Sequence, residues 1–340
     1  MAYDQPLSRS PLLKVQSLSI ALYSRASKVY AVDGLSYELE QGETLAIVGE
    51  SGSGKTVSNM APLGLMPVGV SADIRGKVLF KGEDILTCSI ERLRALRGAE
   101  IGVIFQDPLS ALNPARTIGR QIAEVAELHL GFSHTASEAR ALDLMKMVGI
   151  SEPAMRMRQY PHELSGGMRQ RVVIAMAIAA EPSLLLADEP TTALDVTVQA
   201  QIIRLIKDIQ SRLGMAVVLI THDIGVVAGM ADKLVVMYAG RVAEYGYAKQ
   251  VLTRPVHPYT QALLNSLPRD TDLPGTEFRG LVGSPPSLAV RASGCAFSPR
   301  CHKAFGKCVE ARPSLFDVHE GGLHTSACFA SADAELEVGV

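Results

Sequence analysis

The sequence predicts an α/β protein with a parallel β-sheet at its core, and two patterns carry that prediction. Short apolar runs rich in β-branched residues alternate along the chain with segments of helical periodicity. The runs are apolar at consecutive positions, which is typical of strands buried on both faces of a parallel sheet. A chain of 340 residues can form such a core together with one smaller unit, because single domains usually span about 100 to 200 residues.

Five apolar runs are predicted to be the core strands. The first leads into a glycine-rich turn and then a helix start, so it opens a strand-loop-helix unit. The predicted strands span residues 44–48, 101–105, 184–188, 216–221 and 234–238.

Three predicted helices lie between these strands, and two of them span residues 168–180 and 197–213. In "EARALDLMKMVG", Leu142, Met145 and Val148 recur every third residue, and Gly149 supplies a stop. A further helix begins after the glycine-rich turn. Because Pro62 lies about two turns into that helix and lacks an N–H, we expect the helix to be short or kinked.

The character of the sequence changes beyond about residue 246. The stretches "RPVHPYTQALLNSLPRD" and "GSPPSLAVRASG" are rich in proline and turn-forming residues. We therefore expect a linker or extended segment that leads into a small cysteine-containing unit.

Composition excludes several classes of protein. The net charge of −2 gives no overall field that would attract the chain to nucleic acid or anionic lipid. The longest apolar run, residues 172–180, is half of the ~18 residues that a membrane-spanning helix needs. The first residues lack the basic and apolar segments of a secretion signal, so we expect a cytoplasmic protein with reduced thiols.

The stretch "GESGSGKT" matches the phosphate-binding pattern G-x-x-x-x-G-K-[ST]. Its glycines let backbone N–H groups turn toward an anion, Lys55 reaches the outer phosphates, and Thr56 offers a hydroxyl to Mg²⁺. A plain glycine-rich turn is the alternative, but a predicted strand and helix flank the motif as a nucleotide site requires. The candidate phosphate-binding residues are Gly49, Ser51, Gly52, Ser53, Gly54, Lys55 and Thr56.

Two carboxylates end the strand in "LLLADEP". Adjacent side chains of a strand point to opposite sides, so Asp188 and Glu189 are expected to have different roles. With a phosphate loop in the same chain, Asp188 is predicted to hold Mg²⁺ and Glu189 to orient or deprotonate the attacking water. The alternative is a polar strand end before Pro190.

The stretch "LSGGMRQRVVIAMAIA" lies between these motifs. Ser165, Gly166 and Gly167 start a helix there, which leaves N–H groups and a hydroxyl for a second phosphate-binding surface. "LSGGM", beginning at Leu164, resembles the signature motif of ATP-binding cassette proteins. The resemblance covers residues 12–250, because every motif of that family follows in order.

The resemblance implies a P-loop ATP-binding cassette fold, with a RecA-like parallel-sheet core, an antiparallel β subdomain and a helical signature subdomain. It also implies that two cassettes pack head to tail, each ATP lying between one chain's phosphate loop and the other's signature. The expected organisation is a tail at 1–11, the cassette at 12–250 with its helical subdomain at about 107–180, and an extension at 251–340.

Three more residues take roles from the resemblance. Gln106 in "IFQDP" matches the Q-loop, which contacts the metal and water and senses the transmembrane partner. Asp195 in "TTALD" matches the D-loop at the dimer seam, and His222 in "LITHD" matches the switch histidine at the γ-phosphate. Tyr23 and Tyr30 are both candidates to stack on adenine, although either can be an ordinary packing residue.

Two stretches narrow the resemblance to a branch. "FQDPLSALNP" and "HPYTQALLNSLP" followed by "GCAFSPRC" resemble the ATPase subunits of bacterial dipeptide and oligopeptide importers. The chain is thus expected to hydrolyse ATP and power peptide import, with nickel, glutathione or another peptide-like solute as alternatives. A soluble ATPase acting on nucleic acid or ribosomes is a further, weaker alternative.

The implied partners are a second cassette subunit, homologous or identical, two transmembrane permease subunits and an extracytoplasmic solute-binding protein, with no nucleic acid. The expected location is the cytoplasmic face of the bacterial inner membrane, with peripheral attachment.

Four of the five cysteines lie close together in the sequence, with spacings C-x5-C-x6-C-x19-C. Four thiolates can hold Zn²⁺ or a [4Fe–4S] cluster, and the absence of a C-x2-C pair argues modestly against zinc. The resembling importers imply the iron–sulfur cluster, while a unit without metal stays open. The candidate ligands are Cys295, Cys301, Cys308 and Cys328.

Overall fold

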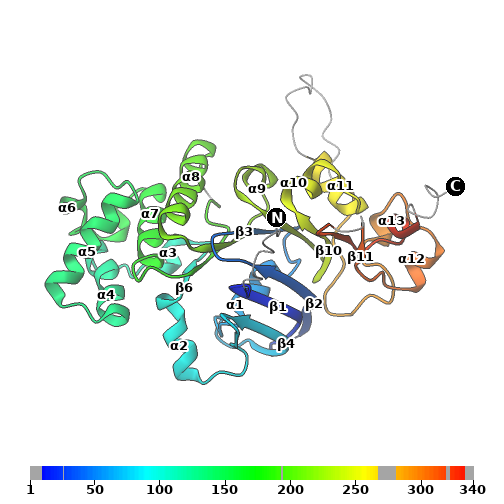
Figure 1. The fold of residues 1–340 in the computed structure, drawn as a ribbon, viewed down its shortest axis with the longest axis horizontal. Helices are drawn as coiled ribbons and strands as arrows, with labels where there is room; N and C mark the ends of the chain where they lie inside the picture. The colour runs from blue at the N-terminus through cyan, green and yellow to red at the C-terminus, as the bar shows by residue number, and fades with distance from the viewer. Residues whose placement is uncertain (1–9, 26, 193, 267–280, 319–321, 334–340) are drawn as a thin grey trace, which may run out of the picture. The chain divides into compact units, whose positions relative to one another are not determined.

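The computed structural model describes residues 10–25, 27–192, 194–266, 281–318 and 322–333 (Figure 1). Residues 1–9 of the predicted tail and 334–340 of the predicted extension lie outside the described residues. Contacts between Cα atoms divide the chain into two compact units. Unit 1 is Met1–Ser17, Ser36–Glu43 and Gly76–Val218, and unit 2 is Leu18–Leu35, Thr44–Arg75 and Leu219–Val340.

Unit 2 is built on a mixed sheet in which the strands run in the order β11-β12-β10-β9-β3. β3 and β9 are parallel, with Ile47 opposite Val235, whereas β9, β10, β12 and β11 pair in antiparallel fashion. Every residue of β3 and β9 is buried, as their apolar sequences predict. The strands are β3 (Thr44–Val48), β9 (Lys233–Tyr238), β10 (Arg241–Tyr247), β11 (Phe316–Asp317) and β12 (His324–Ser326).

The helices of unit 2 are short. The first follows the glycine-rich turn, and it ends before Pro62, as expected. The helices are α1 (Lys55–Met60), α9 (Ile224–Met230), α10 (Ala248–Thr253), α11 (Pro258–Asn265), η2 (Ser298–Arg300), α12 (Gly306–Glu310) and α13 (Phe329–Asp333).

Unit 1 contains the parallel strands β6 (Ile101–Ile104) and β7 (Leu184–Asp188), with Gly102 opposite Leu185. The first residues of β8 (Ala216–Ile220) follow them, since the amide of Ala216 donates to the carbonyl of Ser183. β7 and β8 are buried along their whole length.

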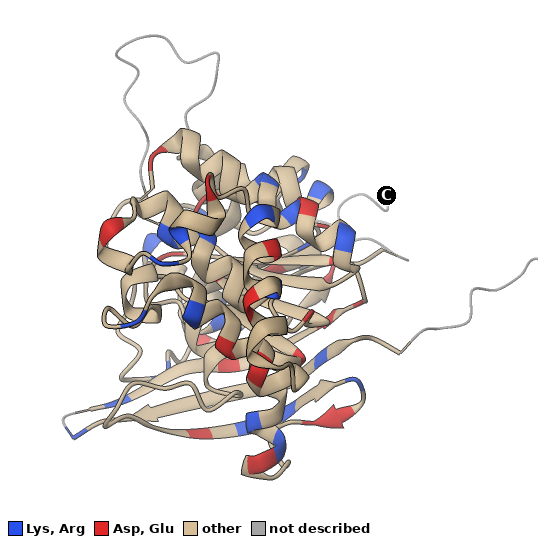
Figure 2. Cartoon of the chain, turned by 90° about the vertical axis from the view of Figure 1, so that its left-hand side faces the viewer, with Lys and Arg blue, Asp and Glu red and all other residues tan. Residues whose placement is uncertain are grey.

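Helices make up most of the rest of unit 1, and α4, α5 and α7 pack on one another. α8 buries Ile202, Ile206 and Ile209, which recur at helical spacing. Lys and Arg are interspersed with Asp and Glu on the side drawn in Figure 2. The helices are α2 (Ile90–Ala99), α3 (Pro108–Ala111), α4 (Ile118–Leu130), α5 (His134–Met147), α6 (Pro153–Arg156), η1 (Pro161–Glu163), α7 (Gly166–Ala177) and α8 (Val196–Leu213).

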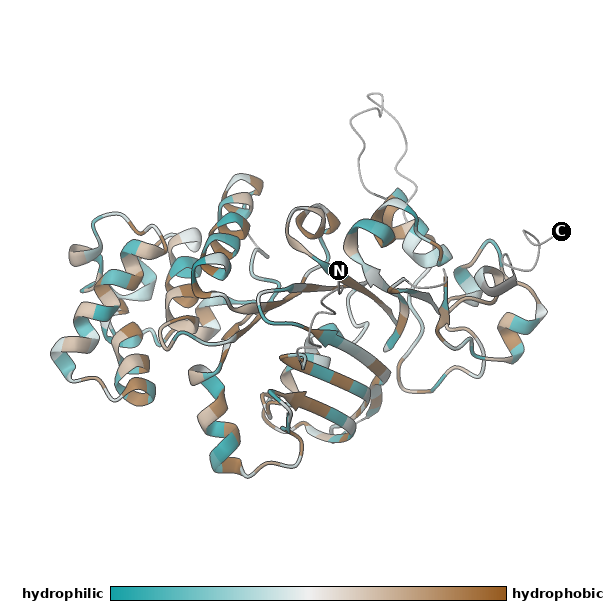
Figure 3. Ribbon diagram, viewed as in Figure 1, coloured by the Kyte–Doolittle hydropathy of each residue, from teal (hydrophilic) through white to brown (hydrophobic). Residues whose placement is uncertain are grey.

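A second sheet has the strand order β2-β1-β4-β5. Its strands are β1 (Leu13–Tyr23), β2 (Lys28–Leu39), β4 (Ser71–Phe80) and β5 (Glu83–Asp84). β1 and β2 alternate between buried and more exposed residues, and Figure 3 shows the matching bands of brown and teal. This alternation is typical of a sheet with one face toward a core. The strands supply the antiparallel subdomain that the family resemblance implies.

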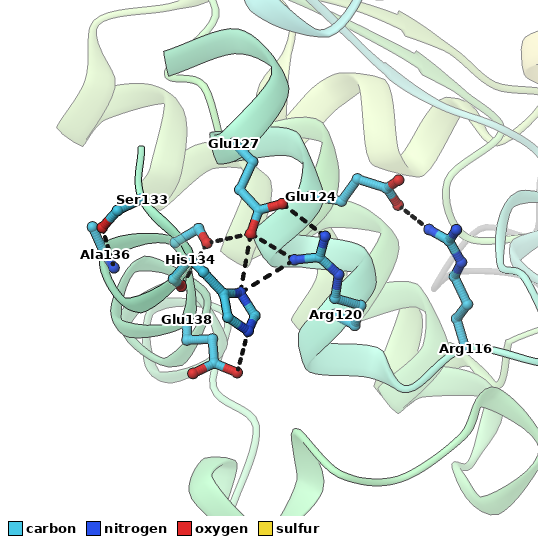
Figure 4. A network of polar contacts seen from close by, with 9 residues as sticks. Arg116, Arg120, Glu124, Glu127, Ser133, His134, Ala136 and Glu138 are labelled. Atoms are coloured by element: carbon cyan, nitrogen blue, oxygen red, sulfur yellow. Dashed lines mark hydrogen bonds and ion pairs between the residues drawn. The ribbon is translucent and has the colours of Figure 1, made fainter. Parts of the chain in front are cut away.

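A polar network joins α4 to α5 (Figure 4). The guanidinium of Arg120 donates two hydrogen bonds, of 2.6 and 2.7 Å, to the carboxylate of Glu127. Ser137 and His134 also contact that carboxylate. These hydrogen bonds lower the pKa of Glu127 to about 2, and the bond from Arg120 has the largest effect.

Most predicted elements of the core are confirmed with small shifts at their ends. The strands at 44–48 and 184–188 match β3 and β7. The helix predicted over 168–180 begins two residues earlier, at Gly166, and ends at Ala177. The predicted domain boundaries at 12, 107, 180 and 250 remain predictions.

The predicted linker beyond residue 246 is wrong at its start, where the structure has α10 and α11. Pro258 is the first residue of α11, a position where a missing N–H removes no helical hydrogen bond. His257 caps this helix through its side chain. The proline that indicated an extended segment therefore marks a helix start.

Candidate functional site

The phosphate loop of unit 2 connects β3 to α1. Gly49 and Gly54 both have positive φ angles, of 152° and 96°. A Cβ atom on Gly49 would overlap the carbonyl oxygen of Met237, and one on Gly54 would overlap that of Ala31. These two positions therefore require glycine for both conformation and space.

Lys55 lies inside this loop and is only 5% exposed. Its Nζ atom donates to the carbonyl oxygens of Gly49 and Glu50 at 2.7 and 2.9 Å. The loop thus holds a buried cation next to the exposed residues Ser51 and Thr56. A phosphate anion is a stronger acceptor for this ammonium group than a neutral carbonyl.

In unit 1, the structure brings two predicted residues together. The Nε2 atom of Gln106 donates to Oε2 of Glu189 at 2.9 Å. The hydroxyl of Thr192 donates to the same oxygen at 2.8 Å, a contact that the sequence analysis missed. A signal was present, because Thr192 follows Glu189 by three residues and closes a turn on its carbonyl.

Asp188 and Glu189 differ in backbone as well as in position. Asp188 is the last residue of β7 and is buried. Glu189 follows the strand with a φ of 46°, so the alternation of strand side chains does not extend to it. The different environments of the two carboxylates thus come from a sharp change in the backbone.

The signature and D-loop residues of unit 1 begin helices. Ser165 is the N-cap of α7, its hydroxyl accepting from the amide of Met168, and the predicted helix start is confirmed. Asp195 is the N-cap of α8 and accepts from the amide of Val198 at 2.9 Å. Leu164 is buried, whereas Ser165, Gly166 and Asp195 are exposed. Capping alone explains the serine and the aspartate, and their nucleotide roles remain predictions.

His222 lies in unit 2, two residues after β8 ends, and is exposed. The amide of the preceding Thr221 donates to the carbonyl of Ile47 in β3, one residue before that strand ends. His222 therefore follows a backbone contact with the strand that leads into the phosphate loop.

The two candidate tyrosines both contact Lys28. Its Nζ atom lies 5.2 Å from the ring centre of Tyr23 and 4.8 Å from that of Tyr30. The guanidinium of Arg291 covers Tyr30 at 4.6 Å. These residues line one pocket of unit 2, which leaves both tyrosines as candidates.

All five cysteines are free thiols within the described residues. The thiols of Cys295 and Cys301 each interact electrostatically with Cys308 and Cys328, and burial raises the pKa of both. In the described parts of the chain, no group of three or more His, Cys, Asp or Glu is placed to hold a metal ion. The structure thus does not support the predicted [4Fe–4S] cluster or the alternative Zn²⁺ site.

The comparisons with known proteins agree with these motifs. The profile of the ABC transporter family matches residues 32–192, and that of the C-terminal region of oligopeptide/dipeptide transporters matches residues 243–308. The dipeptide transport ATP-binding protein DppD of Bacillus subtilis is 47% identical over 318 residues, which cover 94% of each chain. This chain belongs to the ABC transporter ATPase family.

A second relative and a solved structure also match this ABC ATPase. The oligopeptide transport ATP-binding protein OppD of Salmonella typhimurium is 46% identical and covers 98% of each chain. A solved dimer of the ATP-binding cassette MJ0796 bound to ADP and Pi matches with a TM-score of 0.61 and 28% identity, covering 69% of this chain and 98% of that chain. The predicted cassette fold is confirmed.

Proposed function

We propose that this ABC ATPase is the nucleotide-binding subunit that powers the import of dipeptides or oligopeptides through a membrane transporter. The observation that carries the proposal is the match of residues 243–308 to the oligopeptide/dipeptide transporter C-terminal region. That region lies outside the stretch matched by the general ABC profile, so it separates this branch from other cassette ATPases. Relatives named as dipeptide and oligopeptide transport proteins match over more than nine-tenths of the chain.

The proposed roles of the nucleotide motifs follow the family. Bound MgATP supplies the phosphoryl group and the metal charge that stabilises its transfer. Lys55 would bind the outer phosphates, and Thr56, Asp188 and Gln106 would hold the metal. His222 would contact the γ-phosphate, and Tyr23 or Tyr30 the adenine.

Glu189 is the proposed base for the attacking water. Gln106 and Thr192 both donate to its Oε2 atom, which orients the carboxylate. A base must be held within hydrogen-bond reach of the water that it deprotonates, so this orientation supports the role.

The proposed assembly contains two cassettes, two transmembrane permease subunits and an extracytoplasmic solute-binding protein. In this assembly, the signature and D-loop residues would contact the nucleotide of a partner cassette. These residues are Leu164, Ser165, Gly166, Gly167 and Asp195. None of the described helices combines the length and apolar character needed to cross a bilayer. We propose peripheral attachment at the cytoplasmic face of the inner membrane, through the permease subunits.

The alternatives differ in their support. The net charge of −2 gives no overall field that favours nucleic acid. Nickel, glutathione and other peptide-like solutes remain alternative cargoes within the same branch.

A transport assay with the assembled complex tests the proposal. The complex is reconstituted in vesicles with its solute-binding protein and a panel of dipeptides, nickel and glutathione, and ATP hydrolysis and uptake are measured together. Peptide-stimulated hydrolysis with peptide uptake is expected. Uptake of nickel alone, or no stimulation by any peptide, would reject peptide import.

The cysteine unit needs a separate measurement, because only spacing and resemblance support a cluster there. Iron, acid-labile sulfide and zinc are assayed per chain after purification without oxygen. About four irons with matching sulfide would establish the cluster. A chain without metal would leave the ATPase proposal intact.

A further inference from the structure

Glu50, the second residue of the phosphate loop, is held by residues of the C-terminal region. The two terminal nitrogens of Arg300 contact its two carboxylate oxygens at 2.7 and 2.9 Å. The amide of Glu50 donates to the hydroxyl of Tyr259 at 2.9 Å. The Arg300 side chain is 6% exposed and that of Glu50 is 23% exposed, so water screens this pair only in part.

Arg300 is fixed by several contacts besides Glu50. It donates to the carbonyl of Val282 at 2.9 Å and to the hydroxyl of Tyr238 at 3.2 Å. The rings of Tyr238 and Phe297 meet edge to face at 5.2 Å beside it. These contacts fix the guanidinium in one orientation, which allows a bidentate ion pair with Glu50.

Tyr259 is fixed from the other side. It is fully buried on α11, and its amide donates to Nδ1 of His257, the cap of that helix. The buried carboxylate of Glu244 accepts from the amide of His257 at 3.0 Å and contacts Nε2 of His324 at 2.7 Å. α11 is therefore anchored to β10 and β12, and the tyrosine hydroxyl has a defined place.

We propose that Arg300 and Tyr259 are positioning residues for ATP binding, which neutralise Glu50 and fix its backbone so that the phosphate loop accepts a triphosphate. The inference rests on the proposed nucleotide site. Its physical basis is that an unpaired carboxylate within a loop repels the polyanion that the loop must bind. Lys55 donates to the carbonyl of Glu50, so a displaced Glu50 also displaces a partner of the phosphate-binding lysine.

The ATP affinity of full-length variants tests whether Arg300 acts by neutralising Glu50. Arg300→Met is expected to weaken ATP binding on the order of tenfold, because Glu50 keeps its charge without a partner. Glu50→Gln added to Arg300→Met is expected to restore most of the affinity. The loss should shrink as salt is raised, since Glu50 is partly exposed.

The double variant separates positioning from a merely structural role. Both Arg300→Met and the double variant lose the bonds to Val282 and Tyr238, so a folding defect would weaken both alike. Arg300→Lys keeps the charge and is expected to bind better than Arg300→Met. Wild-type affinity in Arg300→Met, or no restoration by Glu50→Gln, would overturn the proposal.

Matched controls come from elsewhere in the chain. Arg120→Met breaks another two-pronged arginine–carboxylate pair, with Glu127, and should leave ATP affinity unchanged. Tyr259→Phe is expected to weaken binding by about threefold, and Tyr247→Phe, at an exposed tyrosine, should have no effect. Lys55→Ala tests the nucleotide site itself. If Lys55→Ala binds ATP normally, the proposed nucleotide site is wrong. If Lys55→Ala loses ATP binding while Arg300→Met binds ATP normally, only the role of Arg300 is rejected.

Discussion

Two glutamates of the nucleotide motifs, Glu50 and Glu189, have different hydrogen-bond donors. Glu189 accepts hydrogen bonds from two neutral groups, the amide of Gln106 and the hydroxyl of Thr192. Glu50 meets the guanidinium of Arg300 with both of its oxygens. These donors to Glu189 are thus an amide and a hydroxyl, whereas Glu50 is paired with a guanidinium, and this difference fits the different roles proposed for the two carboxylates.

Substitutions at Glu189 and at Arg300 should separate the two proposed roles. Glu189→Gln should reduce hydrolysis by at least about a hundredfold while ATP binding stays intact, because the variant loses the proposed base but not the phosphate loop. Arg300→Met should instead raise KM and leave kcat close to its original value at saturating ATP. Phosphate release measures hydrolysis, and nucleotide titration measures ATP binding. Equal changes in kcat for the two variants would contradict different roles for Glu189 and Arg300.

Ser165→Arg extends the contrast to the partner cassette. The bulky side chain at the start of α7 should prevent closure of two cassettes, while ATP still reaches the chain's own phosphate loop. Hydrolysis is expected to fall by at least about tenfold with unchanged nucleotide affinity. ATP-dependent crosslinking of closed dimers in this variant would contradict the arrangement of signature and loop on different chains.

Acid should weaken the anchoring of α11, the helix that carries Tyr259. Burial lowers the pKa of His257 to about 4 from 6.5, against the influence of Glu244, which raises it. The folded state therefore favours the neutral ring, and stability is full above pH 6.5 and falls as pH drops toward 4, by about 3 kcal/mol at most.

Denaturant unfolding at several pH values measures this loss. His257→Asn keeps a side-chain cap on α11 but cannot titrate, so its stability should depend less on pH between 6.5 and 4. The same pH dependence in both proteins would mean that His257 is not the group responsible.

Loss of the Thr192 hydroxyl should have a milder effect on hydrolysis. Thr192→Val removes the hydroxyl that donates to Glu189 and should lower kcat by about threefold to tenfold without changing ATP affinity. Thr192→Ser keeps the hydroxyl and serves as the control. If valine and serine give the same kcat, the hydrogen bond does not contribute to orienting Glu189.

Local patterns made much of this protein predictable. The strands at 44–48 and 184–188, the short helix before Pro62 and the helix start at Ser165 each depend on neighbouring residues alone. The linker prediction failed because proline is common both in extended segments and at the first position of a helix, and only the cap at His257 distinguishes them.

Contacts between residues far apart in the chain could not be predicted from the sequence. Glu50 and Arg300 are 250 positions apart, and nothing in either stretch names the other as a partner. Thr192 was within reach, because it lies one turn from Glu189. The cysteine spacing indicated a metal site, but spacing does not fix how closely the chain brings the thiols together.

The pairing of Glu50 with Arg300 also bears on how the protein is made. A ribosome completes all the nucleotide motifs, through His222, well before it reaches Arg300. During that interval Glu50 lacks the partner that Arg300 supplies. An unfinished or proteolysed chain would then contain every recognisable ATPase motif and still compete poorly for ATP.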